Sequence, residues 1–141
     1  MDKSLTSLLN LPGVFVEYCD YHQDYLYFYL KISSDVISCV NCAAYIEELH
    51  QVRAIIVRDL PAFGRNVYLH LPRRQFYCRA CQHYITERLD FIDLRRKYTR
   101  RYEEKIYQQV NNSSLEKVSI EQNLKVEDIK KIFNYISKKQ K

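Results

Sequence analysis

Two Cys-x-x-Cys motifs constrain the fold of this chain more than any other sequence feature. They are Cys39-Val-Asn-Cys42 and Cys78-Arg-Ala-Cys81, and residues 43–77 separate them. Each motif can present two thiolates to one tetrahedral ion, and four thiolates together are a common zinc ligand set. We therefore predict a structural Zn²⁺ site whose ligands are Cys39, Cys42, Cys78 and Cys81.

A disulfide pair and a redox motif are the alternatives for these cysteines. No signal peptide precedes residue 11, which favours a reducing, cytoplasmic location where paired motifs usually hold metal. A redox motif would stand alone at the start of a helix, and neither copy does. We expect Cys19 to be a buried thiol within a strand. His83 is the one histidine that could replace a cysteine ligand.

A β-hairpin would bring the two motifs together. Residues 51–58 are apolar and β-branched, residues 61–64 carry the turn signal Pro-Ala-Phe-Gly, and residues 66–77 alternate between apolar and polar side chains. A ribbon folded at this turn places both motifs at the same end. Pro72 would then lie in an edge strand or at a bulge.

The first fifty residues predict further strands at residues 14–21 and 25–32. Tyr25, Tyr27 and Tyr29 would share one face of the second strand, and leucine and phenylalanine would form its core face. Such a tyrosine face could stack nucleic-acid bases. The same fifty residues carry seven acidic side chains and only two lysines, which repel phosphate. A packed or partner-facing sheet is the interpretation we favour.

Residues 98–138 switch to a helical period. We expect helices at residues 98–110, 115–122 and 126–138, with the second one opened by a capping box of Ser113 and Glu116. The third would present an apolar stripe to the other two. That stripe consists of Ile129, Ile132, Phe133 and Ile136.

Helix, short turn and helix with a basic outer face form the pattern of a helix-turn-helix, whose second helix lies in a major groove. Ser119 is small enough for close helix approach, and Asn123 suits a left-handed turn. Gln122 is polar where an apolar residue is usual. A plain three-helix bundle is the alternative. In the helix-turn-helix, the DNA-contacting residues of the third helix would be Lys130, Lys131, Asn134, Tyr135 and Lys138.

Positive charge gathers in the middle of the chain. Residues 51–101 carry twelve basic side chains against four acidic ones, and every arginine of the chain lies there. The densest cluster could be only a solvated helix face. Beside a zinc ribbon and a helix-turn-helix, we interpret it as a contact to the backbone of double-stranded DNA, with RNA as a weaker alternative. The cluster consists of Arg95, Arg96, Lys97, Arg100 and Arg101.

These patterns together predict an α+β fold in two domains. Residues 1–93 would form a β-rich zinc-ribbon domain, and residues 94–141 a three-helix helix-turn-helix domain. No apolar run approaches the about 20 residues needed to span a bilayer, so we expect no membrane association.

From end to end, the chain resembles the ISL3 family of bacterial insertion-sequence transposases, in the region that precedes their catalytic domain. The resemblance implies a zinc finger followed by a helix-turn-helix, both recognising the terminal inverted repeats of the element. It implies Cys39, Cys42, Cys78 and Cys81 as metal ligands and the helix at residues 126–138 as the DNA reader. The motifs that carry it are Leu8-Leu9-Asn10-Leu11-Pro12-Gly13-Val14, Cys39-x-x-Cys42, Arg58-Asp59-Leu60-Pro61 with Gly64-Arg65, Phe76-x-Cys78-x-x-Cys81 and Thr86-Glu87-Arg88-Leu89.

Family members continue into an Asp-Asp-Glu catalytic domain, whereas this sequence ends at Lys141. Because no catalytic carboxylate trio can be assigned, we expect a zinc-dependent DNA-binding module, truncated before the catalytic domain and not itself an enzyme. The alternative is a protein-interaction module, or a regulator that inhibits an intact transposase. A homodimer or an intact transposase are further candidate partners.

Overall fold

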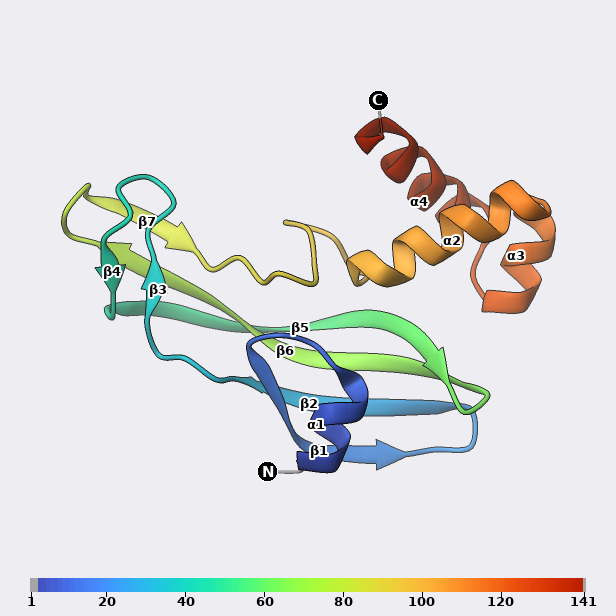
Figure 1. Cartoon of the computed structure of the whole chain (residues 1–141), viewed down its shortest axis with the longest axis horizontal. Helices are drawn as coiled ribbons and strands as arrows, with labels where there is room; N and C mark the ends of the chain where they lie inside the picture. The colour runs from blue at the N-terminus through green and yellow to red at the C-terminus, as the bar shows by residue number, and fades with distance from the viewer. Residues whose placement is uncertain (1–2, 141) are drawn as a thin grey trace.

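A computed structural model describes residues 3–140, and it shows a mixed α+β architecture. A long, twisted sheet forms the body of the molecule, and the last three helices lie above one end of it (Figure 1). At the opposite end lie short strands and the loops that hold the cysteine motifs. The metal-binding end and the helical end are therefore held apart by the length of the sheet.

The main sheet has five strands in the order β1-β2-β6-β5, with β7 also paired to β6. Strands β2 and β6 run parallel, and the other pairs are antiparallel. A separate two-stranded sheet pairs β3 with β4. The strands are β1 (Val14–Tyr21), β2 (Tyr25–Ile32), β3 (Ile37–Ser38), β4 (Tyr45–Ile46), β5 (Leu49–Ala62), β6 (Arg65–Cys78) and β7 (His83–Thr86).

The predicted hairpin is confirmed as the β5–β6 pair. Its turn lies at Phe63 and Gly64, which both have positive φ angles, of 54° and 70°. Glycine reaches that conformation without steric cost. Pro72 lies between the part of β6 that pairs with β2 (residues 66–70) and the part that pairs with β7 (residues 75–78). A residue without an N–H group is tolerated there because this stretch of the strand lacks a partner on that side.

One face of the sheet forms the main hydrophobic core. The alternation predicted for β2 is confirmed, since Leu26, Phe28 and Leu30 are buried and the tyrosines between them face the other way. Helix α1 (Lys3–Leu9) packs against β1, and Phe91 and Ile92 join the same core. The core face is therefore covered by two segments that are far apart in the sequence.

The C-terminal region folds into α2 (Arg100–Asn112), α3 (Leu115–Gln122) and α4 (Val126–Lys139). The predicted cap of the second helix is wrong by one residue: Ser114 accepts a hydrogen bond from the Lys117 N–H, whereas the Ser113 hydroxyl donates to the Gln109 carbonyl. Ser113 and Ser114 are equally good capping residues by sequence. Only the position at which the helix starts shows which of them is the cap.

A second core holds the three helices together. It is built from Tyr102, Ile106, Val118, Ile129 and Ile132, all nearly inaccessible to solvent. The predicted fold class is thus confirmed at the level of an α+β fold with a four-cysteine cluster. The description as a ribbon followed by three helices needs correction, because the described chain has four helices and we did not predict α1. None of the helices in residues 3–140 is long and apolar enough to cross a membrane.

Polar contacts join the helices to the end of β5. The backbone of Arg58 accepts a hydrogen bond from Thr99 N and donates one to Lys97 O, at 2.9 and 3.0 Å. The Arg58 side chain is buried and donates to the side-chain oxygen of Asn66 and to the carbonyl of Gln122. These hydrogen bonds connect the sheet to α3 and so fix the position of the helices on the sheet.

Gln122 is the polar residue that departed from the expected apolar pattern. It is buried, and its side chain accepts a hydrogen bond from the Tyr102 hydroxyl at 3.0 Å and donates one to Gln109 at 3.2 Å. A buried amide is stable when its donors and acceptors are paired. The structure therefore accounts for this polar side chain by pairing it within the helical core.

Candidate metal centre and nucleic-acid interface

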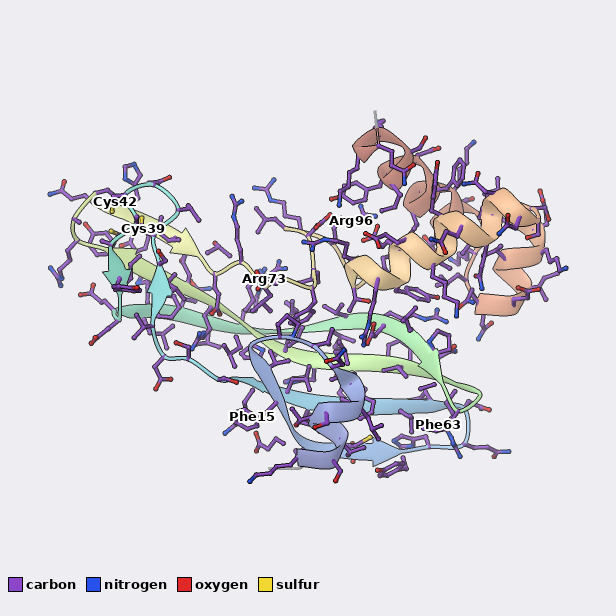
Figure 2. All side chains as sticks on the ribbon, viewed as in Figure 1. Phe15, Cys39, Cys42, Phe63, Arg73 and Arg96 are labelled. Carbon is purple, nitrogen blue, oxygen red and sulfur yellow. The ribbon has the colours of Figure 1, made fainter. Side chains whose placement is uncertain are left out.

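The four predicted zinc ligands come together at one end of the molecule. Cys39 and Cys42 come from the loop between β3 and β4, Cys78 is the last residue of β6, and Cys81 lies in the turn between β6 and β7. All four sulfur atoms lie within 4.8 Å of one another (Figure 2 labels Cys39 and Cys42). The separations are 3.7 Å between Cys39 and Cys81 and 3.6 Å between Cys42 and Cys78.

Backbone conformation shapes both cysteine loops in the same way. Ala43 follows the first motif and Gln82 the second, and both are left-handed, with φ angles of 62° and 57°. The Ala43 N–H donates to the carbonyl of Cys39, and the Asn41 N–H points at the Cys39 sulfur from 3.4 Å. Each Cys-x-x-Cys segment thus turns back on itself, which directs its two thiols to one side.

The dimensions of the cluster fit a zinc ion. A tetrahedron with Zn–S bonds of about 2.3 Å has sulfur–sulfur edges of about 3.8 Å, close to the two observed separations. Burial opposes ionisation of Cys39, but the N–H groups of Asn41 and Cys42 outweigh it and lower the pKa of this thiol to about 7. This thiol is therefore partly ionised at neutral pH. The Ala44 N–H opposes but does not prevent a raised pKa for Cys42 beside the Cys78 thiol, and burial raises the pKa of Cys81 to about 12, so binding of a metal would release protons from the cluster.

The other sulfur and nitrogen candidates are not part of this cluster. His83 uses its Nδ1 atom in a hydrogen bond with the carbonyl oxygen of Cys81, at 2.6 Å. Cys19 lies in β1, where it packs beside the main core and is half-buried, less than the full burial we expected. Among residues 3–140, the only group of three or more potential metal ligands is the four-cysteine cluster.

Part of the basic cluster near residues 95–101 forms ion pairs within the chain. Arg96 donates two hydrogen bonds to Glu103, at 3.0 and 2.8 Å, and Arg101 donates two to Asp59, at 2.9 and 2.5 Å. Both carboxylates are almost fully buried and need a cationic partner. Both arginines therefore already have a carboxylate partner within the chain (Figure 2 labels Arg96). This argues against the prediction that they are free to bind phosphate.

The Asp93 carboxylate binds three further side chains, two of them basic and one aromatic. It accepts hydrogen bonds from Arg100 at 3.0 Å, from the Tyr135 hydroxyl at 2.6 Å and from Lys139 at 2.6 Å. Burial would raise the pKa of Asp93, but these donors outweigh it and lower the pKa to about 2. Tyr135 is half-buried, with Arg96 3.9 Å above its ring. Arg100 and Tyr135, which we expected to contact DNA, therefore share Asp93 as a partner within the chain.

The remaining predicted DNA contacts are exposed. None of them forms an ion pair with another residue in the part of the chain that the structure describes. They divide into two in the loop before α2 and four along the outer side of α4. These residues are Arg95, Lys97, Lys130, Lys131, Asn134 and Lys138.

An aromatic surface covers the sheet face opposite the main core. Tyr29 stacks on Tyr18 with ring centroids 4.1 Å apart, and it also lies 4.9 Å from Tyr27 and 5.1 Å from His70. The tyrosine face expected for β2 is confirmed and extends onto β1 and β6. Sequence periodicity within each strand indicated the face, but the strand order was needed to show how far it reaches.

Comparison with known proteins identifies the metal-binding segment. Residues 35–81 match the model of the zinc finger of the IS204/IS1001/IS1096/IS1165 transposases, the ISL3 zinc ribbon. The transposase for insertion sequence element IS1001 of Bordetella parapertussis is 32% identical over 120 residues, which cover 83% of this chain and 30% of the relative. No solved structure matches the chain.

These matches correct one prediction and confirm two. The relative is a transposase, which is an enzyme, so the prediction that the chain is not an enzyme is wrong. The chain spans 30% of that relative's length. The zinc-ribbon match and the four-cysteine cluster identify Zn²⁺ as the bound metal, as predicted. The resemblance stated from the sequence is confirmed as well: the chain is a relative of the ISL3-type insertion-sequence transposases and contains their zinc-binding module.

Proposed function

We propose that this chain is the part of an insertion-sequence transposase that binds double-stranded DNA and recognises the terminal inverted repeats of its element. In this proposal residues 1–93 are a zinc-ribbon domain and residues 94–141 a helix-turn-helix domain. The ribbon and the loop before α2 hold the DNA backbone, and α4 contacts base edges in the major groove.

The connection between α3 and α4 is the observation that carries this proposal. Asn123 is left-handed, with φ 53° and ψ 48°, and ends α3. The Ser119 hydroxyl donates to the Leu124 carbonyl, which fixes the short turn. Helix α4 buries Ile129, Ile132 and Ile136 against the other helices. Its outer side, which carries lysines and an asparagine, is left available to a DNA groove.

Zinc has a structural role in this proposal. Cys39, Cys42, Cys78 and Cys81 would fill all four positions of a tetrahedral ion, which leaves no open position for a substrate. The same ion would tie the β3–β4 loop to the end of the β6 strand. Folding of this end of the molecule should then depend on metal occupancy.

The proposed DNA contacts follow from which side chains are exposed. Asn134 has the chemistry to pair with an adenine edge, whereas lysines suit phosphates. Residues whose side chains are committed to Asp59, Asp93 or Glu103 are left out of the contact set. The proposed set is Arg95, Lys97, Lys130, Lys131, Asn134 and Lys138.

Two substitutions on α4 test this proposal. Asn134→Ala should weaken binding to an inverted-repeat duplex by about 1–3 kcal/mol and leave binding to a scrambled duplex unchanged. Lys131→Ala should weaken binding to both duplexes and lower the magnitude of the salt slope by about 1. Lys31→Ala, on the far sheet face, is the control that should change neither. Equal loss of affinity for both duplexes from Asn134→Ala would reject its base contact.

The aromatic surface favours a second candidate function, a protein-interaction module. Tyr18 and Tyr25 of this surface are 49% and 37% exposed, and exposed aromatic side chains are enriched at protein interfaces. An intact transposase or a second copy of the chain would be the partner. Sedimentation analysis of the chain, alone and mixed with an intact ISL3-type transposase, tests this candidate. A chain that stays monomeric in both samples would argue against it.

A further inference from the structure

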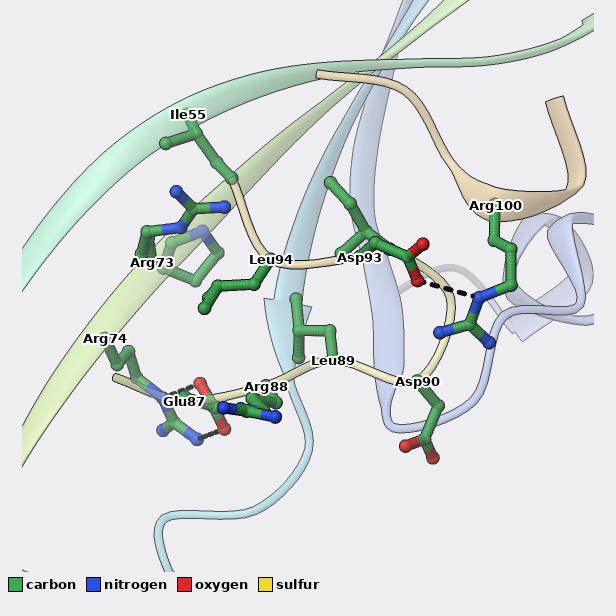
Figure 3. A pocket seen from close by; sticks show the side chains of 12 residues that line it. Ile55, Arg73, Arg74, Glu87, Arg88, Leu89, Asp90, Asp93, Leu94 and Arg100 are labelled. Atoms are coloured by element: carbon green, nitrogen blue, oxygen red, sulfur yellow. Dashed lines mark hydrogen bonds and ion pairs between the residues drawn. The ribbon is translucent and has the colours of Figure 1, made fainter. Parts of the chain in front are cut away.

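A hollow of about 460 Å³ lies between the β5–β6 hairpin and the segment that leads from β7 to α2. Figure 3 shows its lining, which is dominated by charged side chains from both walls. Its apolar part is supplied by Ile55, Pro72, Leu89, Ile92 and Leu94. The basic side chains of the lining are Arg73, Arg74, Arg88 and Arg100.

Two of these four arginines are neutralised within the chain. Arg74 donates to both oxygens of Glu87, at 2.8 and 2.6 Å, and Arg100 donates to Asp93 at 3.0 Å. The Arg74–Glu87 pair is largely buried, with side chains 10% and 9% exposed, whereas in the other pair Asp93 is 18% and Arg100 is 42% exposed.

Arg73 and Arg88 are the uncompensated pair. Within residues 3–140, neither side chain forms an ion pair or a hydrogen bond with another residue. An incoming anion would therefore have no internal partner to displace. The one further acid of the lining is Asp90, which is exposed and is drawn apart from both in Figure 3. The hollow thus offers two guanidinium groups whose charge is unmatched inside the chain.

A third arginine, on the strand next to β6, adds to this positive charge. Arg53 of β5 is the direct cross-strand partner of Arg73 of β6. On this face of the hairpin the residues two positions away are Ile55 and Leu71, which belong to the main core. Like charges placed directly opposite each other destabilise a sheet. An anion bound beside them would relieve that repulsion, and the arginine fork suits phosphate oxygens.

We propose that Arg73 and Arg88, with Arg53 beside them, form a subsite for phosphate groups of a nucleic-acid backbone. The inference rests on the proposed DNA-binding function and extends it to a surface that the helix-turn-helix does not supply. Arg73 lies between the cysteine cluster and the helices (Figure 2). A duplex contacted by α4 would then be held at a second place, on the sheet.

A double substitution tests the subsite. Each phosphate contact contributes about 0.9 to the slope of log K against log salt. The variant Arg73→Gln/Arg88→Gln should therefore lower the magnitude of that slope by about 2. The favourable contribution of one phosphate contact to log K is about zero at 1 M salt and rises by about 0.9 for each tenfold dilution of salt. Each lost contact should therefore weaken binding about eightfold at 0.1 M salt. The readout is fluorescence anisotropy of zinc-loaded protein with a labelled duplex, from 0.05 to 0.4 M salt.

Two control variants separate charge from folding. Arg73→Lys/Arg88→Lys keeps both charges and should keep most of the slope. Lys31→Gln removes an exposed charge on the opposite sheet face, where Lys31 pairs with Glu17 at 3.3 Å, and should leave the slope unchanged. Zinc content and circular dichroism of each variant, compared with wild type, establish that the fold is intact.

The outcomes distinguish this subsite from the proposed function as a whole. Wild-type binding with an unchanged slope in the glutamine variant would overturn the subsite and leave DNA binding by α4 standing. Absence of duplex binding by the wild-type chain would overturn both. Inorganic pyrophosphate offers a probe that does not depend on any substitution. It should shift the Arg73 and Arg88 Nε–H signals in NMR spectra of the wild type, and unshifted signals would also overturn the subsite.

Discussion

The carboxylate of Asp59 joins the sheet to the start of α2, and its removal should loosen this junction. Asp59 is 1% exposed. It accepts hydrogen bonds from the Thr99 hydroxyl at 2.7 Å and from Arg101 at 2.9 and 2.5 Å. The Thr99 side chain also caps α2. The Asp59 carboxylate, at the end of the strand, therefore also holds the residue that starts the helix. We predict that Asp59→Ala is strongly destabilising.

The magnitude follows from what the substitution leaves behind. Thr99 is 0% exposed, and an unsatisfied buried hydroxyl costs about 1–3 kcal/mol. Breaking a fully buried ion pair costs about 3–5 kcal/mol, but the Arg101 side chain is 34% exposed and can turn to water. We reduce that contribution to about 1–2 kcal/mol for this reason. The two contributions together give a loss of about 3 kcal/mol in the free energy of unfolding.

Urea unfolding of the zinc-loaded protein, followed by circular dichroism, measures this loss. Glu104→Ala is the control, because Glu104 is an exposed acid on α2 and its removal should change stability by less than about 0.5 kcal/mol. A double-mutant cycle with Arg101→Ala should give a coupling energy above about 1 kcal/mol. A loss below about 1 kcal/mol for Asp59→Ala, or no coupling, would refute the reasoning.

Two further predictions concern the zinc site and the helical core. Cys78→Ser should abolish stoichiometric zinc binding and the stable fold of the metal-binding end, because metal binding contributes folding free energy; a metal-free variant with the full wild-type dichroism spectrum would contradict this. Burial raises the pKa of Tyr102 to about 12, whereas an unfolded tyrosine ionises near 10. Tyr102→Phe should therefore cost about 1 kcal/mol at pH 7, where Gln122 loses its donor. This cost should shrink between pH 10 and 12, where the wild type alone loses the stabilisation, and a pH-independent difference in urea midpoints would count against it.

Local periodicity predicted most of the secondary structure. Strands β1 and β2 and helix α3 have the bounds expected from the sequence, because alternation, turn residues and the asparagine stop are local signals. The zinc cluster was also predictable, since two Cys-x-x-Cys motifs joined by a hairpin have few other uses. Helix α1 was missed because it spans only seven residues, which is too short for a helical period to stand out.

The roles of the arginines could not be predicted from local patterns. Arg101 pairs with Asp59, and Tyr135 with Asp93, across 42 residues of sequence in each case. A run of basic residues indicates a positive surface only if no distant carboxylate neutralises it. Arg53 and Arg73 are adjacent only because the hairpin register places them opposite each other. Tertiary structure therefore pairs Arg96, Arg100 and Arg101 with acids of the chain, and our proposal adds Arg73 and Arg88 on the sheet to the contacts proposed for the loop before α2.

The central claim is that this chain recognises a DNA sequence. Fluorescence anisotropy of the zinc-loaded protein at physiological salt, with duplexes from the terminal inverted repeats of a related insertion element and with scrambled duplexes, tests it most directly. We predict at least a tenfold preference for the inverted repeats, which corresponds to about 1.4 kcal/mol. Equal affinity for both duplexes, or no binding to either, would contradict the account.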